Sequence, residues 1–196
     1  MRYEHHVSFC GNLIETTATN KASISDDWVH QILSMYRGQH LIIGLDCKRR
    51  PHPITSMGGR TATMQLCVGS KCLILQLLYM DYIPKSLKSF LSNPDITFVG
   101  VEVEENVLRL WGEYGLWCTD AADVHELASR SFPLGFSGKT GLKALAYKVA
   151  KLRMWKPKNG CCGDWESKLL DERQIEQACI DSYSVYKIGI KLLDKI

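Results

Sequence analysis

The sequence predicts an α/β fold in which α-helices flank a mixed β-sheet. Three observations support this fold class: strand-like segments come first, helices and strands then alternate, and a long amphipathic segment ends the chain. The chain has 196 residues, of which 45% are apolar. This length and composition predict one domain, residues 1–196, with a core of its own.

The first part of the chain, residues 1–37, is expected to form a hairpin and a helix. Residues 5–19, HHVSFCGNLIETTAT, alternate between apolar and polar types on either side of a Gly-Asn pair. This pattern is typical of two strands joined by a tight turn. Ser25 is expected to cap a helix that has an apolar face and stops at Gly38.

The middle of the chain contains four further strand candidates. LIIGLD, which ends at Asp46, is a short apolar run typical of a central buried strand. TATMQLCVG and KCLILQLL are strands joined by a tight Gly-Ser turn, and ITFVGV is the fourth. Residues 49–60 contain two Pro, two Gly and three Arg, which predicts an exposed loop.

The remaining segments predict helices. One begins at Pro84, because proline is favoured at the start of a helix. Another spans 104–114, where Val107, Leu108 and Trp111 are spaced to form an apolar stripe. Further helices are expected at 123–130, at 140–151 and, as the closing helix, from about 171 to 195.

Composition excludes some protein classes and leaves others open. No apolar run approaches the roughly 20 residues of a membrane-spanning helix, and the N-terminal segment lacks the apolar core of a secretory signal. We therefore expect an intracellular protein, in the cytoplasm or the nucleus, without a membrane partner. The eight cysteines form no CxxC pair, so Cys47, Cys67 and Cys179 are expected to be buried thiols. A zinc site is the alternative.

Charge is informative only locally, because the net charge is +3. Residues 139–158 carry seven Lys or Arg and no acid. This stretch is either a solvated helix face or a track for a phosphate backbone.

Two aspartates lie where chemistry is expected in an open α/β sheet. Asp46 ends a buried strand, and ligand sites gather at strand ends. Asp181 lies on one face of the last predicted helix. A structural role for each, as a helix cap or in an ion pair, is the alternative to a role in a functional site.

An ordered set of segments extends this interpretation: LIIGLDCKRRP, TATMQLCVGSKCLILQLL, DITFVGVEVEENVLRL, GLKALAYKV, WKPK, DW and QIEQACIDSYSVYKIGIKLL. Over residues 38–193 they resemble the plant relatives of the Werner-syndrome-type exonuclease domain. That family belongs to the DEDD group of 3′–5′ exonucleases, so the resemblance implies a ribonuclease-H-like fold.

The resemblance also implies a chemistry. The DEDD group hydrolyses a phosphodiester with two metal ions, Mg²⁺ or Mn²⁺, which four carboxylates hold. The first motif of the family is Asp-x-Glu, and the second is an Asp just inside the helix that follows a Val-Gly-rich strand. The third motif is Tyr-x-x-x-Asp on the last helix, where the Tyr helps to orient the attacking water.

This chain departs from the family at three of these five positions. Asp46 and Asp181 match, and they are the candidate catalytic residues and metal ligands. Lys48 stands in place of the Glu, Asn106 in place of the second-motif Asp, and Gln177 in place of the Tyr. The neighbouring Glu104 and Glu105 are possible substitutes for the missing carboxylates.

The substitution at Lys48 changes the electrostatics of the site. An ammonium about 4 Å from Asp46 gains about 4 kcal/mol at an effective dielectric near 20, before desolvation. The same charge repels a divalent cation. We therefore expect Lys48 to act as a built-in substitute for one metal ion.

Other residues are candidates for binding a nucleic-acid strand, either RNA or DNA. Basic residues supply phosphate contacts, and an aromatic ring can stack on a base. The candidates are Arg49, Arg50, Lys139, Lys143, Lys148 and Trp165.

Three hypotheses of function follow. The chain is a nucleic-acid-binding, weakly active or inactive relative of the exonucleases; an active exonuclease whose metal site is rearranged or shared between subunits; or a structural subunit that assembles with active relatives. Similar plant proteins form ring-like oligomers, so the resemblance also implies homo-oligomerisation.

Overall fold

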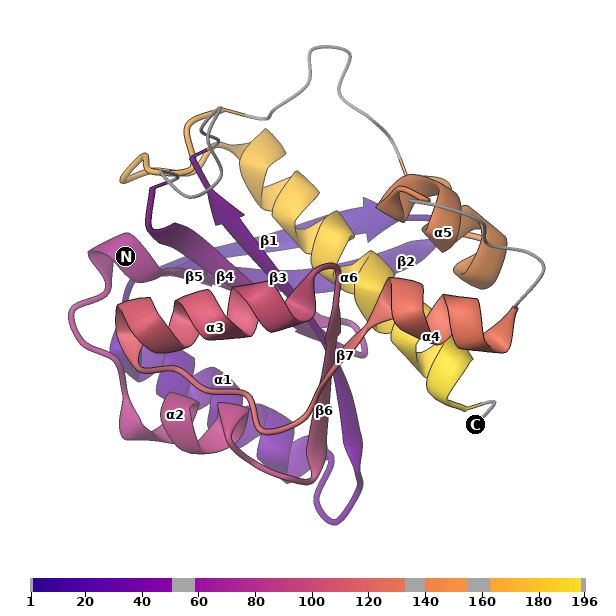
Figure 1. Ribbon diagram of the computed structural model, residues 1–196. Helices are drawn as coiled ribbons and strands as arrows, with labels where there is room; N and C mark the ends of the chain where they lie inside the picture. Colours follow the sequence, from indigo (N-terminus) through magenta and orange to yellow (C-terminus); the bar gives the residue numbers. More distant parts are fainter. Residues whose placement is uncertain (1, 51–58, 133–139, 155–162, 195–196) are drawn as a thin grey trace.

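The computed structural model describes residues 2–50, 59–132, 140–154 and 163–194, and it shows a mixed β-sheet flanked by helices on both faces (Figure 1). The described residues form one seven-stranded sheet in the order β1-β2-β5-β4-β3-β6-β7. The strands are Arg2–Phe9 (β1), Asn12–Thr19 (β2), Leu41–Arg49 (β3), Thr61–Val68 (β4), Lys71–Gln76 (β5), Ile96–Gly100 (β6) and Ala121–Asp123 (β7). The predicted fold class is therefore confirmed.

The strand directions explain why the sheet is mixed. The predicted hairpin forms, and its β1 and β2 are antiparallel and joined by Cys10 and Gly11, both at positive φ. The turn at Gly69-Ser70 likewise joins β4 and β5 as antiparallel neighbours. However, β2 pairs with β5 in parallel, and β6 pairs with β3 and β7 in parallel. No local sequence signal predicted these parallel pairings, because they join segments far apart in the chain.

Helices cover both faces of the sheet, three on each among the described residues. Helices α1 (Ala22–Met35), α2 (Lys85–Leu91) and α3 (Val103–Tyr114) lie over one face, with a 3₁₀ turn η2 at Leu77–Tyr79. Helices α4 (Val124–Ser131), α5 (Leu142–Ala150) and α6 (Glu172–Leu193) lie over the other. Within the described ranges, no helix has both the length and the apolar character needed to cross a membrane.

Helix α6 is the central element of its layer. A capping box starts it: the Asp171 carboxylate accepts from the Gln174 backbone N–H, and the Gln174 side chain accepts from the Asp171 N–H. The helix then crosses the sheet over β3, β4, β5 and β6, with α4 and α5 packed along it (Figure 1).

Two glycines allow α6 to approach the sheet closely. A Cβ at Gly44 of β3 would overlap the Ser182 carbonyl oxygen and lie 2.8 Å from Tyr186 Cβ. A Cβ at Gly189 of α6 would lie 2.6 Å from Val99 Cγ2. The backbone of α6 can therefore lie close to β3 at Gly44 and close to β6 at Gly189 only because these two positions have no side chain.

Two predictions about helices were wrong in detail. Ser25 does not cap α1: it lies inside the helix and is buried, and Lys21 is at the N-cap. The first N–H of the helix, at Ala22, instead donates to the Asp81 carboxylate at 2.9 Å. A cap supplied from a distant part of the chain leaves no local signal.

The predicted apolar stripe of α3 was also misplaced. Val107 is buried, but Leu108 is 63% exposed and Trp111 is 56% exposed. The buried face consists of Val103, Asn106, Val107 and Leu110. The buried side of a helix is predicted from the spacing of its apolar residues. Because Asn106 is polar but buried, that spacing indicated the wrong side of α3.

We predict that Gly44→Ala destabilises the protein by about 1–3 kcal/mol or more, because the added methyl overpacks the contact between β3 and α6. Gly112→Ala is the matched control, since its site on α3 is open and alanine favours a helix by about 1 kcal/mol. Urea unfolding measures both. Equal stability of Gly44→Ala and wild type would contradict the close approach.

Candidate functional site

The candidate site forms where β3 passes beneath α6. Asp46 and Lys48 are two residues apart on β3, so their side chains lie on the same face of the sheet. Asp181 faces them from α6. The Lys48 Nζ lies 2.7 Å from Asp46 Oδ2 and 2.5 Å from Asp181 Oδ2. The structure therefore brings together the two aspartates that the sequence paired, with the ammonium between them.

The three charges are largely enclosed. The exposed fractions of their side chains are 22% for Asp46, 17% for Lys48 and 15% for Asp181. The Lys48 ammonium donates a hydrogen bond to Asp181, whereas its contact with Asp46 is an ion pair outside hydrogen-bond geometry. The Trp165 ring also faces the ammonium, with its centroid 5.8 Å from Nζ, a cation–π distance.

The electrostatic balance keeps Lys48 charged. Burial lowers its pKa, but the charges of Asp46 and Asp181, together with the hydrogen bond to Asp181, outweigh burial and raise the pKa well above its ordinary value. Burial and the charge of Asp46 raise the pKa of Asp181, although Lys48 and the Gln177 side chain oppose this shift. Two carboxylates and one ammonium leave a net formal charge of −1.

The other two positions that the resemblance identifies as substituted, Asn106 and Gln177, also have defined surroundings. Gln177 lies one turn before Asp181 on α6, and its side chain lowers the pKa of Asp181. Asn106 is 6% exposed, and its Nδ2 donates to the Val101 carbonyl at 3.2 Å. The amide at Asn106 therefore satisfies a backbone acceptor, which an ionised carboxylate in its place would not do.

The possible substitute carboxylates do not join this cluster. Glu104 is exposed. Glu105 lies 3.1 Å from Arg109 and 3.6 Å from Arg49. Arg49 thus pairs with an acid. Arg50, with 71% of its side chain exposed, lies 3.8 Å from Glu166.

The remaining nucleic-acid candidates differ in accessibility. Lys143 and Lys148 are exposed on α5. Lys139 lies outside the described residues. Trp165 is only 6% exposed and belongs to the core beneath α6, so its ring faces protein and Lys48 rather than solvent. Its stacking on a base would require that core to open.

The donor set does not fit a two-metal centre. Mg²⁺ and Mn²⁺ require several negatively charged oxygen ligands, and here the space between the two aspartates holds a cation of the protein itself. Within the described ranges, no group of three or more His, Cys, Asp or Glu is placed to hold a metal ion. Cys67 and Cys179 are buried free thiols, as expected, and Cys47 is a free thiol that is partly buried.

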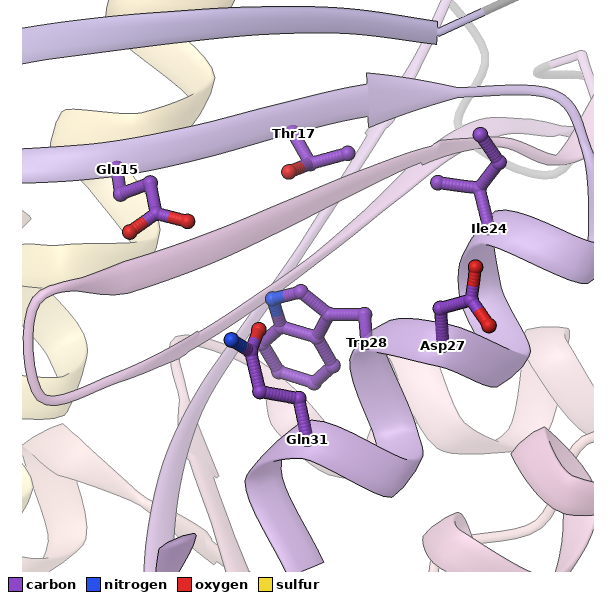
Figure 2. A pocket seen from close by; sticks show the side chains of 6 residues that line it. All are labelled: Glu15, Thr17, Ile24, Asp27, Trp28 and Gln31. Atoms are coloured by element: carbon purple, nitrogen blue, oxygen red, sulfur yellow. The ribbon is translucent and has the colours of Figure 1, made fainter.

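A separate hollow of about 310 Å³ lies on the opposite side of the sheet, between β2 and α1 (Figure 2). Its ionisable groups are the acids Glu15 and Asp27, with the Trp28 indole between the strand and the helix. Acids in this hollow would repel a phosphate. Its six lining residues are Glu15, Thr17, Ile24, Asp27, Trp28 and Gln31.

Sequence reasoning missed one contributor to the site and one ion pair beside it. Gly44 sets the spacing between β3 and α6, and a glycine inside the apolar run LIIGLD is a signal of close backbone approach. The pairing of Arg49 with Glu105 has no such signal, because it depends on how α3 sits against β3.

We predict that Lys48→Met costs about 3–5 kcal/mol of stability at neutral pH, because it leaves two enclosed carboxylates without their cation. Asp46→Asn in addition should recover part of the loss by removing one of the two like charges. Lys71→Met is the matched control: Lys71 pairs with a half-exposed Glu15, so its loss should cost less than about 1 kcal/mol. A Lys48→Met protein as stable as wild type in urea would refute the assigned pairing.

The difference in unfolding free energy between wild type and Lys48→Met should also depend on pH. The raised pKa of Lys48 means that its contribution is complete below its ordinary pKa of about 10.4. It is lost only as pH rises through the higher pKa of the folded state. The stability difference between wild type and Lys48→Met should thus stay constant from about pH 7 to 10 and shrink above. A difference that has already vanished at about pH 9 would be incompatible with the paired ammonium.

Comparison with known proteins places this site in context. The sequence profile of the family described as 3′–5′ exonuclease matches residues 10–196. A 3′–5′ exonuclease of Arabidopsis thaliana is 28% identical over 158 residues, which are 79% of this chain and 54% of that protein. The mouse bifunctional 3′–5′ exonuclease/ATP-dependent helicase WRN is 26% identical over 188 residues, 95% of this chain and 13% of that protein. The chain thus spans about half or less of the length of these relatives.

Solved structures agree with the fold. Escherichia coli RNase D, described as an exoribonuclease involved in structured RNA processing, matches with a TM-score of 0.70 and 21% identity over 87% of this chain and 43% of that one. The EXD2 exonuclease domain soaked in Mn matches with a TM-score of 0.53 and 21% identity, over 91% and 89% of the two chains. The fold is therefore ribonuclease-H-like, and the profile match over nearly the whole chain establishes that it belongs to the 3′–5′ exonuclease family.

Proposed function

We propose that this chain is a nucleic-acid-binding member of the 3′–5′ exonuclease family in which Lys48 takes the place of a catalytic metal ion. In this proposal the protein binds single-stranded RNA or DNA and hydrolyses it slowly or not at all. The observation that carries the proposal is the Lys48 ammonium within 2.7 Å of a carboxylate oxygen of both Asp46 and Asp181.

The loss of hydrolysis follows from charge. In the family the metal ions activate water and stabilise the departing oxygen. An ammonium can satisfy the two aspartates and hydrogen-bond to a phosphate oxygen, but it offers no open coordination position for water.

The binding half of the proposal rests on α5 and the residues after it. Lys143, Lys148, Lys151 and Arg153 are exposed, and no acid occurs between residues 139 and 158. They lie on the same side of the sheet as the candidate site, because α5 packs against α6. A strand leaving the site can therefore meet cations rather than acids.

An active enzyme with a rearranged site is the alternative, and the surroundings of Glu105 argue against it. Glu105 would have to leave both Arg49 and Arg109 to become a ligand. Lys48 would also have to leave its two aspartates. The experiments below separate this alternative from the proposal.

Metal affinity should be poor in wild type and created by three substitutions. If the dissociation constant for Mg²⁺ exceeds about 10 mM, 1 mM Mg²⁺ stabilises the fold by less than about 0.1 kcal/mol, which thermal unfolding would not resolve. Lys48→Glu, Asn106→Asp and Gln177→Tyr together restore two carboxylates and a water-orienting hydroxyl. This variant brings several carboxylates close together, and a bound cation would offset their mutual repulsion. Its melting temperature should therefore rise when metal is added.

The same variant should gain 3′–5′ digestion of labelled single strands with Mg²⁺ or Mn²⁺. Adding Asp46→Asn to it is the control that should abolish both the thermal shift and the digestion. Brisk, metal-dependent digestion by wild type would favour the rearranged site. A folded triple variant that is inert and insensitive to metal would show that these residues are not the counterparts of the family motifs.

Binding of single strands should be detectable at low salt, and log K should fall with log [salt] by about 0.7 per phosphate contact. Lys143→Ala with Lys148→Ala should flatten that slope by up to about 1.4. Lys85→Ala with Lys88→Ala is the control, since these exposed lysines belong to α2 on the opposite layer. No binding by wild type at low salt would remove the proposal and leave the structural-subunit hypothesis.

A further inference from the structure

A basic hollow with an aromatic side lies at the end of α5. Its volume is about 400 Å³, within the range of about 300–1,000 Å³ for small-molecule sites. Lys143 and Tyr147 line it from α5, and Leu152, Arg153 and Met154 line it from the segment that follows. Its ionisable groups are two cations and a phenol, with no acid among them.

The Tyr147 ring is open to solvent, although rings of its size are commonly buried. It is 50% exposed, and Lys151 Nζ and Arg153 Cζ lie 5.9 and 6.0 Å from its centroid. These are cation–π distances, so the two cations are held beside the ring. An aromatic face next to fixed positive charge suits a planar group that carries a phosphate.

The backbone holds this arrangement in a defined geometry. Helix α5 ends with Lys151 at positive φ, and the N–H groups of Lys151 and Leu152 donate to the Tyr147 and Ala146 carbonyls. The Arg153 N–H then donates to Cys10 Sγ at 3.3 Å, which ties the segment to the β1–β2 turn. Leu152 and Met154 anchor it in the core beneath α6.

We propose that Tyr147, Lys143 and Arg153 form a nucleotide subsite for a single strand. In this subsite a base stacks on the Tyr147 ring, and the adjoining phosphate binds the side chains of Lys143 and Arg153. The inference rests on the proposed binding of single strands and deepens it by naming a contact outside the exonuclease motifs. The subsite lies on the layer of the Asp46–Lys48–Asp181 cluster, where α5 runs beside α6 (Figure 1).

A nucleic acid fits this hollow better than an acidic peptide does. Both would use the cations, but only a base makes use of an exposed ring, and stacking on aromatic side chains is the sequence-tolerant contact of single-strand binders. An acidic peptide of poly-glutamate is therefore the competing ligand to test.

The experiment measures the affinity of a labelled single-stranded oligonucleotide for wild type and variants by fluorescence anisotropy. Tyr147→Ala should weaken binding about 5- to 150-fold, the range for loss of one stacked base. Tyr147→Phe should keep wild-type affinity, because the ring is retained. Tyr82→Ala is the matched control: Tyr82 is 59% exposed, lies just before α2 and should not contribute. Ala is tolerated in a helix, so Tyr147→Ala should fold.

Two further measurements separate stacking from charge. Tyr147→Ala should leave the salt dependence of binding unchanged, whereas Lys143→Ala with Arg153→Ala should flatten it. An oligonucleotide with abasic positions should bind wild type more weakly than the intact strand does, and should bind Tyr147→Ala and wild type equally well.

The outcomes distinguish the subsite from the broader function. If wild type binds no strand at low salt, the proposed function fails. If wild type binds but Tyr147→Ala behaves like Tyr82→Ala, only the subsite is overturned. If poly-glutamate displaces the strand and its own binding needs Tyr147, the hollow is a peptide site and the subsite proposal is wrong.

Discussion

The site depends on the close approach of α6 to β3. Gly44 lets the helix backbone approach the strand, and this spacing brings Asp181 to the same ammonium as Asp46. Without that contact, Lys48 would have one partner rather than two, and two enclosed acids would lack a shared cation. The packing constraint and the electrostatic one are thus linked: close backbone packing places the charges, and the charge triad joins the strand to the helix.

This linkage suggests how a metal-dependent scaffold can persist without its metals. A site built from carboxylates is destabilised by its own like charges until a cation is present. Lys48 supplies that cation permanently, since the two aspartates hold its pKa well above the ordinary value. Under the proposed function, the fold therefore does not depend on metal concentration. The Asn106 amide likewise satisfies the Val101 carbonyl, which an ionised acid at this position would not do.

Much of the fold could be predicted from sequence, because most elements carry local signals. The strand LIIGLD, the Gly69-Ser70 turn and the closing helix from about residue 171 are examples. Local signals failed where contacts between segments far apart in the chain determine the structure. Examples are the Asp81 carboxylate that caps α1 and the parallel pairing of β2 with β5. For the site, the order of the motifs predicted that Asp46 and Asp181 lie close together. The burial of Trp165 and, outside the site, the exposure of the Tyr147 ring depend on tertiary packing, which residue spacing does not reveal.

The most direct test of the central claim is the anomalous diffraction of crystals grown with millimolar Mn²⁺. The account predicts no manganese peak between Asp46 and Asp181, with the Lys48 ammonium at hydrogen-bond distance from Asp181. A manganese ion bound to both aspartates, with the Lys48 side chain turned away, would contradict the account.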